Sequence, residues 1–448
     1  MRSRAMRKAT RRYLWDRMQV SLWFVPSVMA LGAVLLSWLL GLLDERVPNQ
    51  MLNNSKFFLT GTPSEMRTAM LSIAGTVLAT AGVVFSLLTL PLSTVASQFG
   101  SRLLRIFMRD RTTQFVLGMF VATFSYCLAT AMSIPNVPTQ VGAPQITVTF
   151  GLVMMLLTFA SLIILIQHIS TMLQAPNIVA AAGADLLDVV GMDTTEEASE
   201  TQNPVATVEQ VTSSLVEEAA YSLRVQRMGY VQFVDPEIIL NLARERDLVI
   251  RLLRKPGQFV RLGETAALVW PAASVDERLA KHLRRGVQIG NQRTPTQDVE
   301  YAINQLVEIA VRAMSPAIND PFTALTCLDY LADGLAKHAQ YGETSSNFYD
   351  NDGRLRLVYE PADLVELLDA AFNMLRHASC DNASVLLAML DAIDDIGQET
   401  KSPEVRQELL RHVHLVQAER QAGALVEQDR LNISQRCEML ETKLGIEG

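Results

Sequence analysis

The chain has 448 residues, 49% of them apolar, and its 39 lysines and arginines are outnumbered by 47 aspartates and glutamates. The charges are divided unevenly, because residues 1–176 hold 14 basic and 5 acidic residues while the remainder holds 25 and 42. An acidic C-terminal part argues against a nucleic-acid partner, since phosphate contacts need clustered lysine and arginine. Four widely spaced cysteines without a C-x-x-C pair predict neither a disulfide framework nor a zinc site.

Four apolar segments dominate the first part of the chain. They lie at about residues 20–43, 70–90, 115–132 and 146–166. Each is long enough to cross the ~30 Å hydrocarbon core of a lipid bilayer. We therefore predict a basic tail at residues 1–19, followed by a four-helix transmembrane domain at residues 20–176.

The charges between the apolar segments predict the orientation in the membrane. The first seventeen residues contain seven basic side chains, and four arginines lie between the second and third segments. Basic connections remain on the cytosolic side of a membrane. We expect a multi-pass protein of the plasma membrane, with both termini and the acidic part in the cytosol.

Small residues recur at every third or fourth position along the second segment. They are Ser72, Gly75, Ala79, Gly82, Ser86, Thr89 and Ser93. Such a stripe allows helices to pack closely in lipid. It could equally form the wall of a pore in a homo-oligomer, where its hydroxyl groups would face water or ions. The helix that carries it is predicted to exceed the thickness of the bilayer and to project into the cytosol.

The acidic part begins with a predicted linker, residues 177–206, and continues with a small mixed α/β domain, residues 207–290. Strands are expected at "YSLRVQR", "GYVQFV" and "LVIRLLR", and a helix is expected to begin at Pro236 with Asp235 as its N-cap. The run "GQFVRLGETAAL" is similar to the hammerhead turn of biotinyl and lipoyl β-sandwich modules. The acceptor lysine of those modules is absent, so we expect a β-sandwich-like unit without a cofactor.

Residues 291–448 are predicted to form a helical cytosolic domain. Helices are expected over "TQDVEYAINQLVEIAVRAM" and over about residues 361–378, 382–397 and 403–443, the last interrupted near Gly423. The predicted fold class is therefore all-α in the membrane, with a cytosolic α+β region after it.

The run "SPAINDP", residues 315–321, is the most distinctive motif of the helical domain. Asp320 before Pro321 is typical of a helix N-cap followed by proline at the first helical position, which predicts a corner between two helices. A second hypothesis is a site for a small anionic ligand or a protein partner. Its candidate residues are Arg293, Gln297, Asp298, Arg312, Ser315, Asn319, Asp320 and Thr323.

Several segments together resemble one family of bacterial membrane proteins. These are "GVVFSLLTLPLSTVASQFGSRLLRIFMRDRTTQFVLGMFVATFSYCL", "GYVQFVD", "GQFVRLGETAALVWP" and "RTPTQDVEYAINQLVEIAVRAMSPAINDPFTALTCLD". They are similar to the predicted membrane proteins catalogued as domain of unknown function 2254. The resemblance implies four spans, a cytosolic domain and the bacterial inner membrane. It implies no activity.

Two functions remain open. The first is a homo-oligomeric, channel-like protein with a cytosolic sensing domain, and the second is a non-conducting scaffold or regulator anchored in the membrane. No P-loop, G-x-S-x-G elbow, zincin or Rossmann motif is present. We therefore expect no enzyme, catalytic residue or metal site.

Overall fold

The computed structural model describes residues 23–47, 58–98, 110–134, 144–195, 220–341, 347–350, 352–359, 362–422 and 424–445. The chain divides into two compact units. One comprises Trp15–Asn177, and the other includes Ile178–Gly448.

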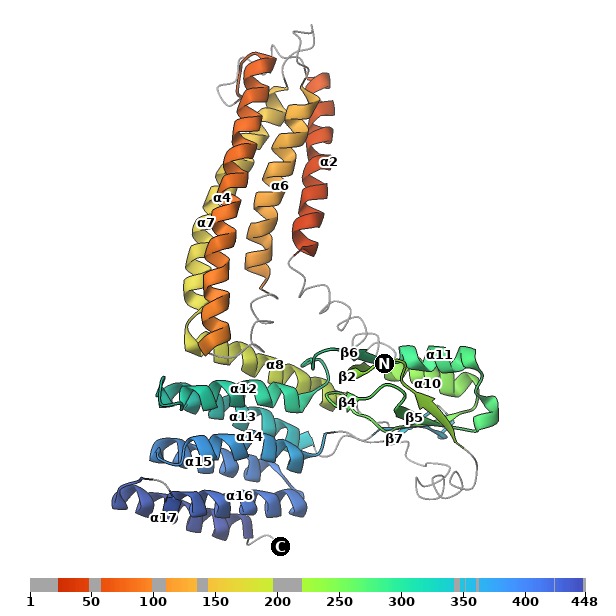
Figure 1. Cartoon of the computed structure of the whole chain (residues 1–448), viewed down its shortest axis with the longest axis vertical. Coiled ribbons are helices and arrows are strands. Elements are labelled where there is room, and N and C mark those ends of the chain that lie inside the picture. The colour runs from red at the N-terminus through yellow and green to blue at the C-terminus, as the bar shows by residue number, and fades with distance from the viewer. Residues whose placement is uncertain are drawn as a thin grey trace. The chain divides into compact units, whose positions relative to one another are not determined.

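The first unit consists of four helices (Figure 1). They are α2 (Phe24–Arg46), α4 (Pro63–Gln98), α6 (Arg111–Ser133) and α7 (Gln145–Met172). All four are long and apolar enough to cross a membrane. Helix α6 packs against each of the other three and provides the fully buried Tyr126.

Hydroxyl groups connect the helices of the first unit. Ser37 on α2 lies 2.9 Å from Thr130 on α6, between the two hydroxyl oxygens, and Thr123 on α6 lies 2.8 Å from Thr158 on α7. The hydroxyl of Tyr126 donates to a backbone carbonyl of α7 at 2.8 Å. Such bonds satisfy polar groups where no water is available, so they specify how these helices pack.

The second unit contains two sheets. The larger has the strand order β1–β5–β3–β8–β7, and its only parallel neighbours among the described strands are β3 and β8. The smaller, β4–β2–β6, is antiparallel. The strands are β1 (Tyr221–Arg224), β2 (Gly229–Val234), β3 (Val249–Leu252), β4 (Phe259–Val260), β5 (Thr265–Trp270), β6 (Val287–Gly290), β7 (Asn347–Tyr349) and β8 (Leu355–Val358).

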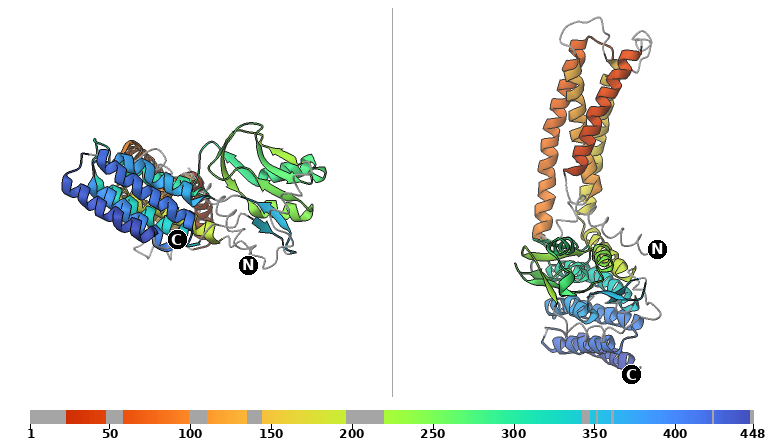
Figure 2. Two further views of the ribbon diagram at one scale, coloured as in Figure 1. Left: turned by 90° about the horizontal axis from the view of Figure 1, so that it is seen from below. Right: turned by 90° about the vertical axis from the view of Figure 1, so that its right-hand side faces the viewer.

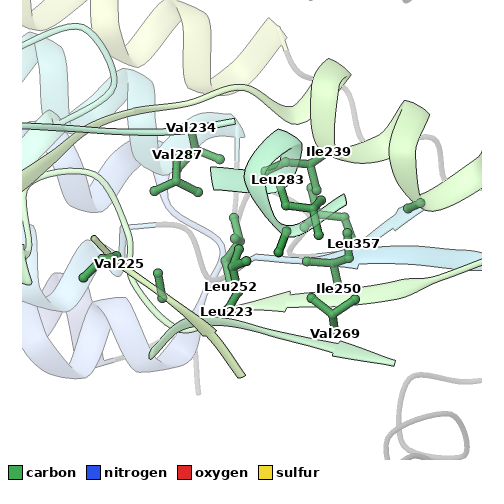
Figure 3. Close-up of a cluster of buried hydrophobic side chains, with 14 of the residues drawn as sticks. Leu223, Val225, Val234, Ile239, Ile250, Leu252, Val269, Leu283, Val287 and Leu357 are labelled. Carbon is green, nitrogen blue, oxygen red and sulfur yellow. The ribbon is translucent and has the colours of Figure 1, made fainter. Parts of the chain in front are cut away.

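Two short helices, α10 (Pro236–Glu245) and α11 (Glu277–Arg285), complete this part. Asp235 caps α10 as predicted, because its Oδ1 accepts a hydrogen bond from the backbone N–H of Ile238 at 3.1 Å. One apolar core joins these helices to both sheets, and Figure 3 shows Ile239 and Leu283 from the helices beside Ile250 and Val269 from the strands.

Six helices form three stacked hairpins in the rest of the second unit (Figures 1 and 2). They are α12 (Val299–Ala313), α13 (Pro321–Tyr341), α14 (Leu364–Ala378), α15 (Ala383–Glu399), α16 (Pro403–Ala422) and α17 (Glu427–Gly445). Each hairpin packs against the next, α12 against α14 and α14 against α16 on one side, and α13 against α15 and α15 against α17 on the other.

The predicted linker is helical in its first part. Helix α8 (Ala175–Thr195) covers residues 177–195 of the predicted 177–206, and residues 196–206 lie outside the described residues. The helix forms because Ile178, Val179, Ala182, Leu186 and Val190 recur at helical spacing and are buried. It packs closely on α13, where a Cβ added to Gly183 would lie 2.2 Å from the ring of Tyr330.

Four apolar helices followed by a sheet-containing region are confirmed. The sheets, however, also use residues from the predicted helical domain. Strands β7 and β8 lie between α13 and α14, and β8 pairs with β3 through Ile250 and Leu357. A parallel pairing between segments about a hundred residues apart leaves no local pattern in the sequence.

Candidate functional site

The small-residue stripe of α4 faces outward in its unit. All seven members are exposed, namely Ser72, Gly75, Ala79, Gly82, Ser86, Thr89 and Ser93. The buried residues of the helix include Met66, Met70, Ala74, Val77 and Val84. At about 100° per residue, the two faces are roughly opposite each other. Among the described residues, the stripe therefore does not serve packing within one copy of the chain.

The two glycines of the stripe have open space in front of them. A Cβ added to Gly75 or Gly82 would meet no atom within 4 Å. The contrast is Gly151 on α7, where an added Cβ would lie 2.9 Å from the sulfur of Met70. Gly151 is small because a neighbouring helix lies close to it. The described part of the chain places no atom near Gly75 or Gly82 that would require a glycine there.

Three hydroxyl groups of the stripe, those of Ser72, Ser86 and Thr89, are bound to the backbone of their own helix. Ser72 donates to the carbonyl of Thr68 at 2.8 Å, and Ser86 donates to the carbonyl of Gly82 at 3.1 Å. Thr89 donates to the carbonyl of Ser86 at 2.8 Å. A hydroxyl has one proton to donate and two lone pairs. Because these hydroxyl protons are donated to backbone carbonyls, the hydroxyl oxygens can only accept hydrogen bonds from, or coordinate, a molecule outside the helix.

The motif "SPAINDP" forms the predicted corner between two helices, α12 and α13. The backbone N–H of Asp320 donates to Ala313 at 2.8 Å, and the backbone N–H of Asn319 donates to Ser315 at 2.9 Å. The carboxylate of Asp320 accepts from the backbone N–H of Thr323 at 3.2 Å and from its hydroxyl at 2.6 Å. Asn319 has a φ of 49°, a left-handed conformation that asparagine tolerates.

The outer surface of the corner is apolar. Ile318 is 44% exposed and Phe322 is 77% exposed. Arg312, at the end of α12, pairs with Glu308 one turn earlier, with 3.2 Å between Nη2 and Oε1. The side chains of Asp320, Thr323 and Arg312 are thus bound to the chain itself, which favours the structural interpretation of the motif.

A second polar cluster precedes α12. The guanidinium of Arg293 donates to both oxygens of Asp298 at 2.7 Å, and its Nη2 lies 3.1 Å from Glu300. Asp298 is 4% exposed and caps α12 by accepting from the backbone N–H of Tyr301 at 2.9 Å. Burial raises the pKa of Asp298 above its ordinary value, and the hydrogen bonds and charge of Arg293 oppose that rise.

Gln297 connects the start of α12 to the smaller sheet. Its side-chain oxygen accepts from the backbone N–H of Val234 at 2.8 Å, and its side-chain nitrogen donates to the carbonyl of Val234 at 3.0 Å. The side-chain amide thus makes the same pair of hydrogen bonds to Val234, at the end of β2, that the backbone of a neighbouring strand would make. Its role in this structure is to hold the helical stack to the sheet.

The eight predicted corner residues are not gathered in one place. Arg293, Gln297 and Asp298 precede α12, whereas Arg312, Ser315, Asn319, Asp320 and Thr323 lie at its end or beyond. The helix between them has 15 residues and a length of about 22 Å. A full helix separates the two groups, so the structure does not bring all eight residues together, and a ligand or partner site at either group stays a prediction.

A third polar cluster was not predicted from the sequence. Asp369 on α14 and Glu408 and His412 on α16 place one ligand atom each within 4.8 Å of one another, a spacing that could hold a metal ion. The guanidinium of Arg411 contacts both carboxylates. The E-x-x-x-H spacing on one helix is the signal that could have indicated this cluster.

His412 is neutral at the centre of that cluster. It is 1% exposed and packs edge-on against Phe372. Burial, reinforced by the charge of Arg411, lowers the pKa of His412 to about 4. The guanidinium already supplies the positive charge that the two carboxylates require, so the cluster is accounted for as an ion-pair network that joins two hairpins.

The chain is similar in sequence to two mycobacterial proteins. An uncharacterized protein of Mycobacterium bovis and one of Mycobacterium tuberculosis are each 28% identical to it over 391 residues. The alignments cover 84% of this chain and 72% of each relative. No solved structure matches the chain.

A family model described as "Predicted membrane protein (DUF2254)" matches residues 19–395. The match includes all four apolar helices, both sheets, the motif "SPAINDP", the first hairpin and all but the last four residues of the second. The resemblance seen in the sequence is thereby confirmed, and the chain belongs to the DUF2254 family of predicted membrane proteins.

Proposed function

We propose that this protein is a homo-oligomeric, channel-like protein of the bacterial inner membrane. In this proposal both termini and the second unit lie in the cytosol, where that unit senses a signal and catalyses no reaction. The observation that carries the proposal is the exposed stripe of α4. A run of small residues lets another helix approach closely in lipid, and the oxygen atoms of its hydroxyl groups can face water or ions.

The length of α4 supports the proposal. Its 36 residues correspond to about 54 Å of helix, well above the ~30 Å of a bilayer core. Large apolar side chains flank the stripe and are exposed, among them Leu71, Leu78, Val83 and Phe85. These side chains suit lipid, so copies of α4 would meet through the stripe between them.

The direction of the hydroxyl bonds suggests which ions would pass. Ser72, Ser86 and Thr89 donate their protons to their own helix, so oxygen lone pairs remain for the lumen. Oxygen lone pairs bind cations and the hydrogens of water. We therefore expect cations to be favoured over anions, with a weak preference because no charged side chain lies on the stripe.

The test is salt flux from liposomes that contain the purified protein. Ser86→Leu places a large apolar side chain on the stripe, and we expect it to abolish flux. The matched control is Thr76→Leu, because Thr76 is also exposed on α4, lies off the stripe and donates to the carbonyl of Ser72 at 2.9 Å. Thr76→Leu should retain the flux of the unaltered protein.

Two results would contradict the proposal. If neither the unaltered protein nor the control releases any ion under an osmotic or ionic gradient, the protein is a non-conducting scaffold or regulator. If Ser86→Leu conducts as well as Thr76→Leu does, the stripe does not line the pathway.

A further inference from the structure

A cavity of about 400 Å³ opens in the sheet-containing part of the second unit. Residues 223–227, from the end of β1 and the turn after it, line one side. The end of α11 and strand β6 line the other side. Strands β1 and β6 are edge strands of different sheets, so the cavity lies where the two sheets separate. Its volume is in the range of small-molecule sites.

The floor of the cavity is apolar. Five aliphatic side chains contribute to the lining, and each is at most 9% exposed: Leu223, Val225, Ala266, Val287 and Ile289. They belong to the core shared by the sheets and the two short helices, and Figure 3 labels Leu223, Val225 and Val287 within it. A rigid apolar floor suits the flat or apolar part of an organic molecule.

The remaining lining is basic and polar. It consists of Arg224, Arg227, Arg284, Arg285, Gln226 and Gln288, and no acidic residue lines the cavity. Four arginines at one cavity are unexpected in this part of the chain, since residues 177–448 hold 42 acidic and 25 basic side chains. The concentration of positive charge is therefore local to the cavity.

The arginines differ in how they are held. Arg284 is fixed, because its Nη1 donates to Glu277 at 2.9 Å and its Nε donates to the carbonyl of Arg224 at 3.1 Å. The side chains of Arg224, Arg227 and Arg285 are exposed. In the described part of the chain, no acidic side chain pairs with any of these three. They are available to bind an anion.

We propose that this cavity binds a small phosphorylated molecule with a flat or apolar body, of the nucleotide class. Guanidinium groups bind phosphate oxygens through paired N–H donors and also stack on planar rings. The arginines would hold the phosphates, the aliphatic floor would contact the base, and the amides of Gln226 and Gln288 would bind its polar edge. The proposed binding does not depend on ion conduction. The cavity would bind the same ligand whether the protein is a channel or a scaffold.

The test is isothermal titration of the full chain in phosphatidylcholine nanodiscs, in which no anionic lipid competes for the arginines. The probes are ATP, GTP, inorganic tripolyphosphate and adenosine. We expect both nucleotides to bind with sub-millimolar affinity, since the arginines recognise phosphate whatever the base. Tripolyphosphate lacks a body for the apolar floor and adenosine lacks phosphate, so each should bind at least tenfold more weakly.

The decisive variant is Arg227→Ala/Arg285→Ala, which removes two arginines that hold no other part of the described chain. It should weaken nucleotide binding at least tenfold and reduce the dependence of binding on salt. The matched control is Arg244→Ala/Arg278→Ala, which removes the same charge from exposed positions on α10 and α11 outside the cavity.

Each alternative result is informative. Absence of nucleotide binding would overturn the proposal, as would equal weakening by the two double variants, which would indicate attraction by overall charge. If tripolyphosphate binds as tightly as ATP does, the apolar floor plays no part and the assignment to nucleotides is wrong. Salt flux from liposomes is measured for the same two double variants. If both conduct equally, loss of nucleotide binding has no effect on conduction, so either proposal can be contradicted without the other.

Discussion

The carboxylate of Asp298 joins three parts of the second unit. It accepts two hydrogen bonds from Arg293, caps α12 through Tyr301, and lies against the backbone at Gly257. Gly257 has a φ of 89°, and a Cβ added there would lie 2.3 Å from Oδ2 of Asp298. The glycine is therefore required both for its backbone conformation and for the space that Asp298 occupies.

Gly257→Ala is expected to destabilise the second unit by about 3 kcal/mol or more, because it adds displacement of a buried ion pair to backbone strain. The matched control is Gly263→Ala, with a φ of 81° and no atom within 4 Å of the added Cβ. At Gly263 only backbone strain opposes the substitution, and we expect the free energy of unfolding to fall by about 1 kcal/mol. Urea unfolding of the full chain in detergent, followed by tryptophan fluorescence to which Trp270 contributes, measures both. Equal losses would show that Asp298 does not restrict Gly257.

Individual residues were predictable where their role is local. Asp235, Asp320 and Pro321 were recognised as helix starts, because capping depends on residues three positions apart. Arg293 and Asp298 were named only among the candidate residues of a ligand or partner corner, and the ion pair between them was not predicted. Their contact with Gly257 and the binding of Gln297 to Val234 join segments far apart in the chain, which no spacing in the sequence reveals.

At the scale of elements, α13 shows how the corner motif works. The carboxylate of Asp320 satisfies the backbone N–H and the hydroxyl of Thr323, and Pro321 occupies the first helical position, where its missing N–H is no loss. Helix α13 then buries Cys327, Leu328 and Leu331 in the stack. The corner thus positions a core helix.

Asp320→Ala is expected to lower the free energy of unfolding by about 1 kcal/mol, the usual cost of losing an N-cap. Asp320→Asn keeps an acceptor oxygen and should cost less than half as much. The two variants are compared by the same urea unfolding. If Asp320→Ala were as stable as the unaltered protein, the capping role would be refuted and the motif would need a functional explanation.

Elements with strong apolar periodicity were predicted best. The four apolar helices and the interruption near Gly423 follow from runs that are long compared with a helical turn. Helix α8 was missed because its C-terminal end is acidic and rich in threonine, which is typical of a linker. The whole segment, including its apolar face, was therefore assigned to the linker. The pairing of β8 with β3, and of β7 with β8, was missed because it depends on the tertiary fold.

At the scale of the whole molecule, two features are not explained by contacts among the described residues of one chain. The stripe of α4 is exposed and open at Gly75 and Gly82. The arginine-lined cavity holds Arg227 and Arg285 without an acidic partner in the described part of the second unit. The sequence indicated the stripe through its spacing. It did not indicate the cavity, because residues 223–227 and 284–289 meet only in the folded unit.

The central claim is that copies of α4 meet through the stripe, and cysteine cross-linking in the membrane tests it most directly. Ser86→Cys places a thiol on the stripe, and Thr76→Cys places one on an exposed position away from it with the same native cysteines present. Under mild oxidation, we expect Ser86→Cys to form disulfide-linked dimers and Thr76→Cys to remain monomeric on a denaturing gel. Dimers of Thr76→Cys at the same yield, or none of Ser86→Cys, would contradict the account.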